Sequence, residues 1–316
     1  MKKDNKAIYF IKDHAIWLVF ILLMILFEIA NTRFLTANNI ITMIRQVSMY
    51  GIASIGMTFV ILLADIDLAT GSILTFVNII CAYMMVNMGI HPVLAVIISL
   101  VAATLIGLLN GIMVANFRIP ALIATYAAQT VFAGLALIIC GGVSISIKSI
   151  EGFTVIGQGY VGAIPVPIII MAVCFAVGSF ILNKTYFGRY FYAVGGNAEA
   201  AELSGIRVRN VKYLCFALSG FFAGLAGIVM LSRTNSGTGT AGDGFEFDVI
   251  TCVVLGGVSV SGGVGKLSNV LAGVLIIGAL KNGMVLMNIN SYIQMVVTGI
   301  VLAVAVGYDC MSKKKD

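Results

Sequence analysis

Long apolar runs, separated by short polar segments, make up most of this chain and limit what it can fold into. The sequence of 316 residues is 60% hydrophobic and only 10% charged, with a mean hydropathy of +1.07. Soluble domains carry about 25% charged residues, so this chain has too few charges to cover a surface that faces water. The sequence therefore predicts a protein whose main solvent is lipid.

Ten segments have the length and composition of membrane-spanning helices, which need about 20 predominantly apolar residues. They are residues 15–32, 40–63, 70–88, 92–115, 120–141, 163–182, 212–231, 247–263, 267–286 and 291–309. The segment 247–263 differs from the others because it is short and contains glycine pairs at 256–257 and 262–263. We expect an all-α polytopic membrane protein, with about ten transmembrane helices in one domain over residues 1–316.

The Lys and Arg residues indicate how these spans are oriented, since cytoplasmic loops of membrane proteins carry an excess of them. With the N-terminus in the cytoplasm, all but five of the 19 Lys and Arg residues fall on the cytoplasmic side. The five exceptions are Arg33, Arg45, Lys148, Arg233 and Lys281. Lys281 is close enough to the outer interface for its amine to reach water. We therefore expect both termini to be cytoplasmic.

The charge balance and the rarer residue types exclude several functional classes. A net charge of +6 could attract nucleic acid, but in a polytopic protein such cations set the topology, so no nucleic-acid partner is expected. The six cysteines contain no CxxC pair, so neither a zinc site nor a disulfide framework is predicted. His14 and His91 are the only histidines, and they complete no catalytic or metal site. A membrane-embedded enzyme is not expected.

The glycine-rich segment Gly262–Lys266 has some likeness to a phosphate-binding loop but does not fit the pattern. That pattern requires a glycine five residues before its final glycine and a Ser or Thr after the lysine. Here these positions hold Val260 and Leu267. The chain therefore has no evident nucleotide site and is expected to bind no cofactor, and any use of ATP would come from another subunit.

Polar residues inside or beside apolar runs are candidates for a translocation path, because ionisable groups within a membrane are costly unless paired or hydrated. Asp65 and Asp67 follow an apolar run, and Ser72 can help begin the next helix. We interpret this segment as a helix break that lines the path or its inner gate, with a simple interfacial turn as the alternative. Asn78 and Asn110 lie within predicted spans and either line the path or bond across helices.

One polar segment, residues 186–212, stands between two apolar runs and mixes acidic with basic residues. Within it, Glu199–Leu203 can form a short helix with a narrow alanine face, which Gly205 can end. Small residues allow such a helix to enter a groove on a partner. We interpret the segment as a cytoplasmic docking surface for a separate motor protein, with an ordinary polar loop as the alternative.

Four segments carry motifs of one known family, in order and at the family's spacing. Glu199-Ala200-Ala201, followed by Gly205, is similar to the EAA loop of bacterial ABC importer permeases. Three other segments resemble the family signatures GGIDLSVGS, IPxFIxTL and VLGGTSLSGG, and they are Asp67–Ser72, Asn116–Thr125 and Val254–Gly263. Together the four segments resemble the ribose-type monosaccharide permeases over nearly the whole chain.

The resemblance implies an importer of the bacterial inner membrane with several subunits. This chain would pair with a second copy or a paralogue, two cytoplasmic ATPases would use ATP and Mg, and an external binding protein would deliver the sugar. Residues 186–210 would hold the helix that couples to the ATPase. The residues that the resemblance assigns to this coupling are Gly188, Arg189, Gly196, Asn197, Glu199, Ala200, Ala201 and Gly205.

Departures from the family pattern leave the substrate open among ribose and similar pentoses or hexoses. Ala64-Asp65 replaces a Gly-Gly pair, and Leu122–Tyr126 departs from Phe-Ile-x-Thr-Leu. One alternative is a permease for branched-chain amino acids or nucleosides within the same superfamily. Another is a secondary transporter driven by H⁺ or Na⁺, with Asp65 and Asp67 at its centre, although this leaves residues 186–210 unexplained.

Overall fold

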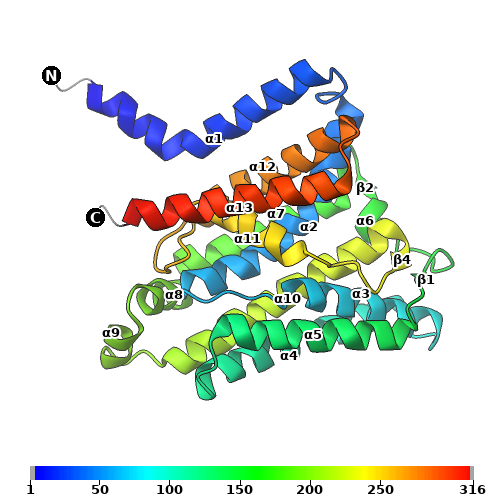
Figure 1. Ribbon diagram of the computed structural model, residues 1–316. Helices are drawn as coiled ribbons and strands as arrows, with labels where there is room; N and C mark the ends of the chain where they lie inside the picture. Colours follow the sequence, from blue (N-terminus) through cyan, green and yellow to red (C-terminus); the bar gives the residue numbers. More distant parts are fainter. Residues whose placement is uncertain (1–3, 314–316) are drawn as a thin grey trace.

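The computed structural model describes the backbone of residues 4–313 and the side chains of residues 16–311. This part of the chain is built almost entirely of helices (Figure 1). Among the described helices, seven are long and apolar enough to cross a membrane. They are α2 (Ala37–Leu62), α4 (Pro92–Asn116), α5 (Ala121–Cys140), α7 (Val166–Lys184), α10 (Val208–Thr234), α12 (Leu267–Leu286) and α13 (Ser291–Lys313). The expected all-α, multi-pass membrane architecture is therefore confirmed.

Three further helices belong to the bundle but have shorter apolar lengths. The described apolar part of α1 (Asp4–Ala30) is Ile16–Ala30, α3 (Thr70–Val86) has 17 residues, and α11 (Phe245–Leu255) has 11. At 1.5 Å per residue, 17 residues are near the minimum for a span, and 11 residues cover about half of the hydrocarbon core. The count of about ten spans therefore stays a prediction.

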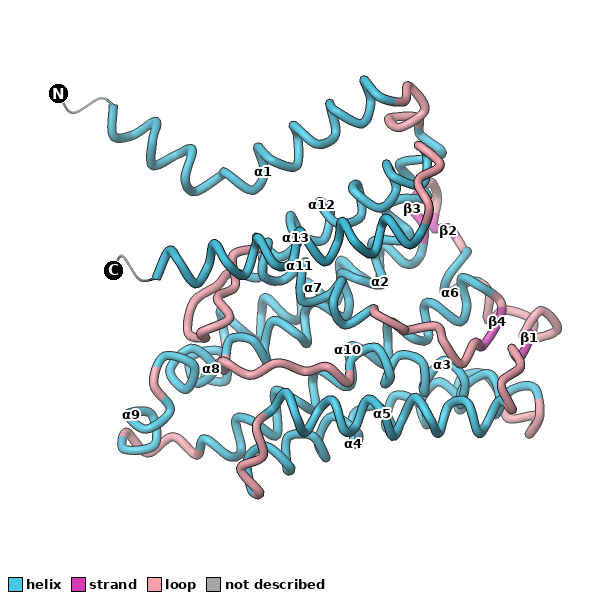
Figure 2. The backbone as a smooth tube through the Cα atoms, viewed as in Figure 1, coloured by secondary structure: helices cyan, strands magenta, loops and turns pink. Residues whose placement is uncertain are grey.

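The remaining elements are short and gather at the two ends of the bundle (Figure 2). One end carries α8 (Tyr186–Gly196) and α9 (Ala198–Leu203), and we call it the α9 end. The opposite end, which we call the strand end, carries α6 (Val155–Gln158), β1 (Ile145–Ser146), β2 (Tyr160–Val161), β3 (Ile164–Pro165) and β4 (Ser236–Gly237). There β1 pairs antiparallel with β4, with Ile145 opposite Gly237, and β2 pairs antiparallel with β3. These pairs tie together the loops that precede α7 and α11.

Helices α2 and α10 form the centre of the bundle. Of their apolar windows, 83% and 67% of the residues are buried. Glycines let α4 approach α10 closely, since a Cβ on Gly107 would overlap the carbonyl oxygen of Phe216 and one on Gly220 would overlap that of Ala103. Small residues at such crossings allow backbones to meet, which is how helices associate in a membrane. The abundant glycine of this sequence is therefore used in part for packing.

The outer helices present apolar side chains to their surroundings. In α4, α5, α7 and α13, the buried share of the apolar window is only 28, 22, 28 and 6%. Val101, Leu105 and Leu109 on α4 are each more than half exposed. An exposed apolar area of this extent marks a membrane or protein contact surface. The fold thus agrees with the expectation that lipid is the main solvent.

The predicted span 247–263 is wrong over its second half. The helix α11 ends at Leu255, and residues 256–266 are irregular. The amide of Val258 bonds the carbonyl of Val253 at 3.2 Å, and Gly257 adopts a positive φ of 77°, which is a glycine-dependent helix end. Apolar composition continues beyond this point, but glycine stops the helix.

Candidate functional site

The short helix α9 is capped at both ends by its own sequence. The side chain of Asn197 accepts a hydrogen bond from the amide of Ala200 at 2.9 Å, and this satisfies one of the free amides at the helix start. At the other end, Gly205 has a φ of 88°, and the amide of Ile206 bonds the carbonyl of Ala201 at 3.0 Å. This glycine cap confirms the predicted short helix and its end.

Most of α9 lies free of the rest of the bundle. Ala201 is the member of the helix that is buried, whereas Leu203 is 91% exposed. Glu199, Ala200 and Glu202 are exposed as well. An apolar side chain held open on a rigid, self-capped helix suits contact with another protein. The predicted coupling residues of this segment therefore lie together on one protrusion.

Three segments that are distant in the sequence meet at the α9 end, and we call this meeting point the glycine junction. It consists of Leu62–Ala64 at the end of α2, Gly195–Gly196 at the end of α8, and Gly262–Gly263 in the loop after α11. The amide of Gly263 donates to the carbonyl of Leu62 at 2.9 Å. A Cβ on Gly195 would overlap that same carbonyl oxygen, so the backbones are in direct contact.

The glycine junction is continuous with α9 through α8. The hydroxyl of Tyr192 on α8 donates to the carbonyl of Gly265 at 2.8 Å. Gly188 is buried in the first turn of α8, where a Cβ would overlap the carbonyl of Leu182, and Arg189 beside it is exposed. Helix α8 therefore connects α9 with the end of α2 and with the loop after α11.

The acidic segment between α2 and α3 is held inside the chain. Asp67 is fully buried, and one carboxylate oxygen accepts from the amide of Ala69 at 3.0 Å while the other accepts from the hydroxyl of Ser219 at 2.7 Å. Ser72 is buried too, and its hydroxyl donates to the carbonyl of Ala69 at 2.9 Å. These contacts fix the helix break and tie it to α10, while the predicted role in a path stays a prediction.

Asp65 forms an ion pair at the α9 end. Its carboxylate lies 2.7 Å from the amine of Lys212, at the start of α10. Burial raises the pKa of Asp65, and the positive charge of Lys212 opposes that rise. The pair borders a cavity of about 350 Å³ that Arg118, Glu202 and Arg209 also line. The ion pair thus links the segment between α2 and α3 to α10, the helix that follows α9.

The two predicted intramembrane asparagines lie on α3 and α4. The amide nitrogen of Asn78 donates to the carbonyl of Gly227 at 3.4 Å, and its oxygen accepts from the amide of Thr238 at 2.9 Å. Asn110 on α4 is fully buried, and among the described residues its side chain has no hydrogen-bond partner. Asn78 therefore forms hydrogen bonds to other elements of the fold, which is one of the two interpretations of the sequence.

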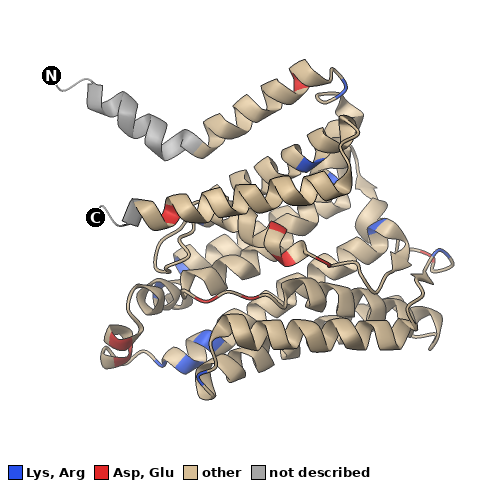
Figure 3. Ribbon diagram, viewed as in Figure 1, with Lys and Arg blue, Asp and Glu red and all other residues tan. Residues whose placement is uncertain are grey.

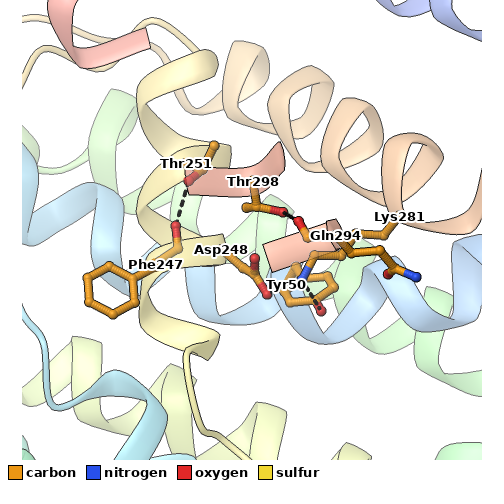
Figure 4. Close-up of polar contacts among 7 residues, drawn as sticks. All are labelled: Tyr50, Phe247, Asp248, Thr251, Lys281, Gln294 and Thr298. Carbon is orange, nitrogen blue, oxygen red and sulfur yellow. Dashed lines mark hydrogen bonds and ion pairs between the residues drawn. The ribbon is translucent and has the colours of Figure 1, made fainter. Parts of the chain in front are cut away.

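A second polar cluster, which the sequence reasoning missed, lies between α11, α12 and α13 (Figure 4). Its centre is an ion pair between Asp248 and Lys281. The amine of Lys281 also lies 3.4 Å from the hydroxyl of Tyr50, so it points into the bundle instead of extending to water as expected. Two opposite charges in adjacent apolar runs were the signal that could have revealed the pair.

The described part of the chain shows no cluster suited to metal binding. Within it, no group of three or more His, Cys, Asp or Glu residues is placed to hold a metal ion.

Comparison with known proteins gives consistent matches over most of the chain. Residues 39–306 match the family model described as "Branched-chain amino acid transport system / permease component". The ribose import permease protein RbsC of Bacillus subtilis is 43% identical over 289 residues, which cover 91% of this chain and 89% of that protein. Its counterpart in Haemophilus influenzae is 41% identical over 94% of this chain and 93% of its own length.

A relative with a different named sugar matches to a similar extent. The L-arabinose transport system permease protein AraH of Escherichia coli is 37% identical over 302 residues, covering 96% of this chain and 92% of that protein. No solved structure gives a significant match.

Proposed function

Because this chain belongs to the family of permease components of branched-chain amino acid transport systems, we propose that it is the membrane permease of an ATP-driven importer for a monosaccharide. Its relatives are named as permeases for ribose and L-arabinose, which favours a sugar over the amino acids in the family description. The substrate we propose is ribose or a similar pentose or hexose. The chain is a transport subunit and not an enzyme.

The observation that carries this proposal is the exposed, self-capped helix α9. It presents Leu203, 91% exposed, on a segment whose two ends are fixed by Asn197 and Gly205. Such a surface suits insertion into a groove of an ATPase subunit. The chain itself is proposed to bind no cofactor, and ATP and Mg would be used by that ATPase.

The coupling would run from α9 through the glycine junction. Since the backbones of Gly195, Leu62 and Gly263 are in direct contact, a movement of α9 by the ATPase would shift the ends of α2 and α11 together. These helices lie in the buried part of the bundle. ATP-driven switching of a path between outward and inward access is therefore physically supported by this arrangement.

The orientation proposed places the α9 end in the cytoplasm of a bacterium and the strand end outside its inner membrane. Acidic residues mark α9 and basic residues flank it (Figure 3). Arg189, Arg207 and Arg209 are exposed there, in keeping with the excess of cations in cytoplasmic loops. The terminal Lys residues and His14 lie outside the described side chains. Both termini are proposed to be cytoplasmic, with residues 1–316 forming one permease domain.

Three partners complete the proposed system. The ATPase would bind at the α9 end, an external sugar-binding protein at the strand end, and a second copy of this chain or a paralogue beside it in the lipid. The large apolar area on α13, whose apolar window is 6% buried, is available to lipid or to that second permease. No nucleic-acid partner is proposed.

Uptake in membrane vesicles tests the function directly. Vesicles that contain this chain should accumulate radiolabelled ribose, or another sugar of a panel with L-arabinose and hexoses, only when the ATPase, the binding protein and ATP are present. Leu203→Asp should reduce uptake roughly tenfold or more, as expected for an interface anchor, while membrane insertion is unchanged. Leu203→Met, which keeps the apolar contact, is the matched control.

Two outcomes would contradict the proposal. Uptake by this chain alone that a protonophore abolishes would indicate a secondary transporter. In the structure its two acidic candidates are already bonded, Asp65 to Lys212 and Asp67 to Ser219, which does not favour that alternative. Wild-type uptake by Leu203→Asp would remove α9 from the proposed interface.

A further inference from the structure

A cavity whose lining is largely apolar, with a few polar groups, lies within the bundle, away from the glycine junction. It occupies about 480 Å³ between α11, α12 and α13, and we call it the α11–α13 cavity. Cavities of roughly 300–1,000 Å³ are the usual size of small-molecule sites. The residues of its lining that matter here are Phe247, Asp248, Lys281, Gln294, Met295 and Thr298. Figure 4 shows Asp248, Lys281 and Tyr50 meeting at the centre of this region, with Gln294 and Thr298 on the neighbouring helix α13.

The charges at the centre of the cavity compensate one another. Asp248 is 8% exposed and pairs with Lys281, whose amine also approaches the hydroxyl of Tyr50 at 3.4 Å. The ring of Tyr50 stacks on Phe245 at 5.1 Å between centroids. A buried charge is stable only if it is paired and hydrogen-bonded, so this pair is a fixed and nearly neutral polar wall.

The opposite wall belongs to α13 and offers uncharged polar groups. The amide nitrogen of Gln294 donates to the carbonyl of Ile289 at 2.8 Å, and the hydroxyl of Thr298 donates to the carbonyl of Gln294 at 2.9 Å. These bonds orient both side chains and leave the side-chain oxygens of Gln294 and Thr298 as acceptors. The two residues are one helical turn apart and therefore share a face.

The two faces of α13 differ in chemistry. Gln294 and Thr298 line the cavity, whereas Ile293, Val296 and Ile300 are exposed and apolar. Polar groups that faced hydrocarbon would carry a desolvation cost, so in membrane proteins they turn to a water-filled space or to partners. The polar face of α13 therefore lines the cavity, while its apolar face is directed away from it.

We propose that the α11–α13 cavity is a sugar-contact site of the transport path, an inference that rests on the proposed function. Phe247 is one of the lining residues and is 49% exposed, and an aromatic side chain can contact the apolar face of a sugar ring. The Asp248–Lys281 pair and the oxygens of Gln294 and Thr298 can hydrogen-bond the hydroxyls. A few polar groups beside an aromatic wall are typical of small-molecule sites.

The same charges argue against a carboxylate substrate at this site. Among the described lining residues, Lys281 is the cation, and Asp248 already pairs with it. An amino acid would have to displace Asp248 to reach this cation, whereas a neutral polyol can bond the pair without separating it. The ion pair thus favours a neutral ligand over a simple carboxylate at this site.

Accessibility of an introduced thiol tests whether the cavity holds water and sugar. In cells that take up ribose through this chain, Gln294→Cys is treated with a charged, membrane-impermeant methanethiosulfonate. Cys140→Ser and Cys310→Ser form the background, since the other four cysteines are buried. We expect modification of Gln294→Cys, slowed by ribose, and little modification of Val296→Cys, the control on the apolar face of the same helix.

Transport kinetics provide a second and independent readout. Phe247→Ala should raise the KM for ribose roughly three- to tenfold, the range of one aromatic contact, and Phe247→Tyr should restore it. Phe180→Ala is the matched control, because Phe180 is 61% exposed on the outer helix α7.

The outcomes separate the two proposals. If the wild-type chain takes up no sugar on the panel, the proposed function fails. If the wild-type chain takes up ribose while Gln294→Cys stays unmodified in every condition, or Phe247→Ala keeps the wild-type KM, the sugar-contact site is overturned and the function stands.

Discussion

The glycine junction and the α11–α13 cavity both join distant segments of the chain, but with different chemistry. At the junction, backbone meets backbone: the amide of Gly263 bonds the carbonyl of Leu62, and Gly195 leaves no room for a side chain. In the cavity, the side chains of Asp248 and Lys281 make the connection. Substitution can change the chemistry of a cavity that side chains line, whereas it cannot change the groups that two backbones offer each other. The junction therefore suits invariant transmission of movement, and the cavity suits selectivity.

The largest effect is expected from removing one charge of the cavity. Lys281→Met leaves Asp248 buried without its partner, and breaking such a pair costs about 3–5 kcal/mol. The melting temperature of the purified protein in detergent should fall strongly. The matched variant carries Asp248→Asn together with Lys281→Met, and it should recover much of the loss because no charge stays unpaired. Equal melting temperatures for the single and double variants would contradict the side-chain description of this site.

A smaller effect is expected at the glycine junction. Gly195→Val places a side chain against the carbonyl of Leu62, and overpacking of this kind costs about 1–3 kcal/mol. The loss of ATP-dependent uptake should be larger than the loss of stability alone would cause, because the contact between α8 and α2 lies on the proposed coupling route. At Gly134, on the outer helix α5, a Cβ would meet nothing within 4 Å, so Gly134→Val is the matched control and should transport normally. Normal uptake by Gly195→Val would show that the junction transmits nothing.

The smallest effect on stability is expected at α9. Asn197→Ala removes the cap that Ala200 uses, which costs about 0.5–2 kcal/mol of local helix stability. Amide hydrogen exchange over residues 198–203 should become faster, and coupling to the ATPase should weaken, while the global melting temperature hardly changes. Asn183→Ala is the control, because the bond from Asn183 to Ser179 is exposed and caps no helix. Unchanged exchange in α9 would indicate that contacts with the bundle hold the helix.

Local signals in the sequence were sufficient for α9. Asn197 and Gly205 fix its two ends through contacts within a few residues, so the short helix could be predicted without any knowledge of the fold. The same local reasoning failed at 247–263, where apolar composition suggested a longer span. There the backbone turns at Gly257, with a φ of 77°, and composition alone does not distinguish a packing glycine from one that ends a helix.

The sequence by itself determined that the chain lies in lipid, that it is all-α and that α9 forms a short polar helix. Hydropathy and helix caps act over one or two helical turns, so these features need no knowledge of the fold. Only the tertiary structure decided which polar groups meet. Asp248 pairs with Lys281, which lies 33 residues away in the sequence. Asp67 accepts a hydrogen bond from Ser219, which lies 152 residues away. Such pairs depend on how helices cross, which side-chain packing over the whole bundle sets. Asp65 and Asp67, between α2 and α3, are bonded inside the chain, whereas the α11–α13 cavity is lined by residues of three helices that only the fold brings together.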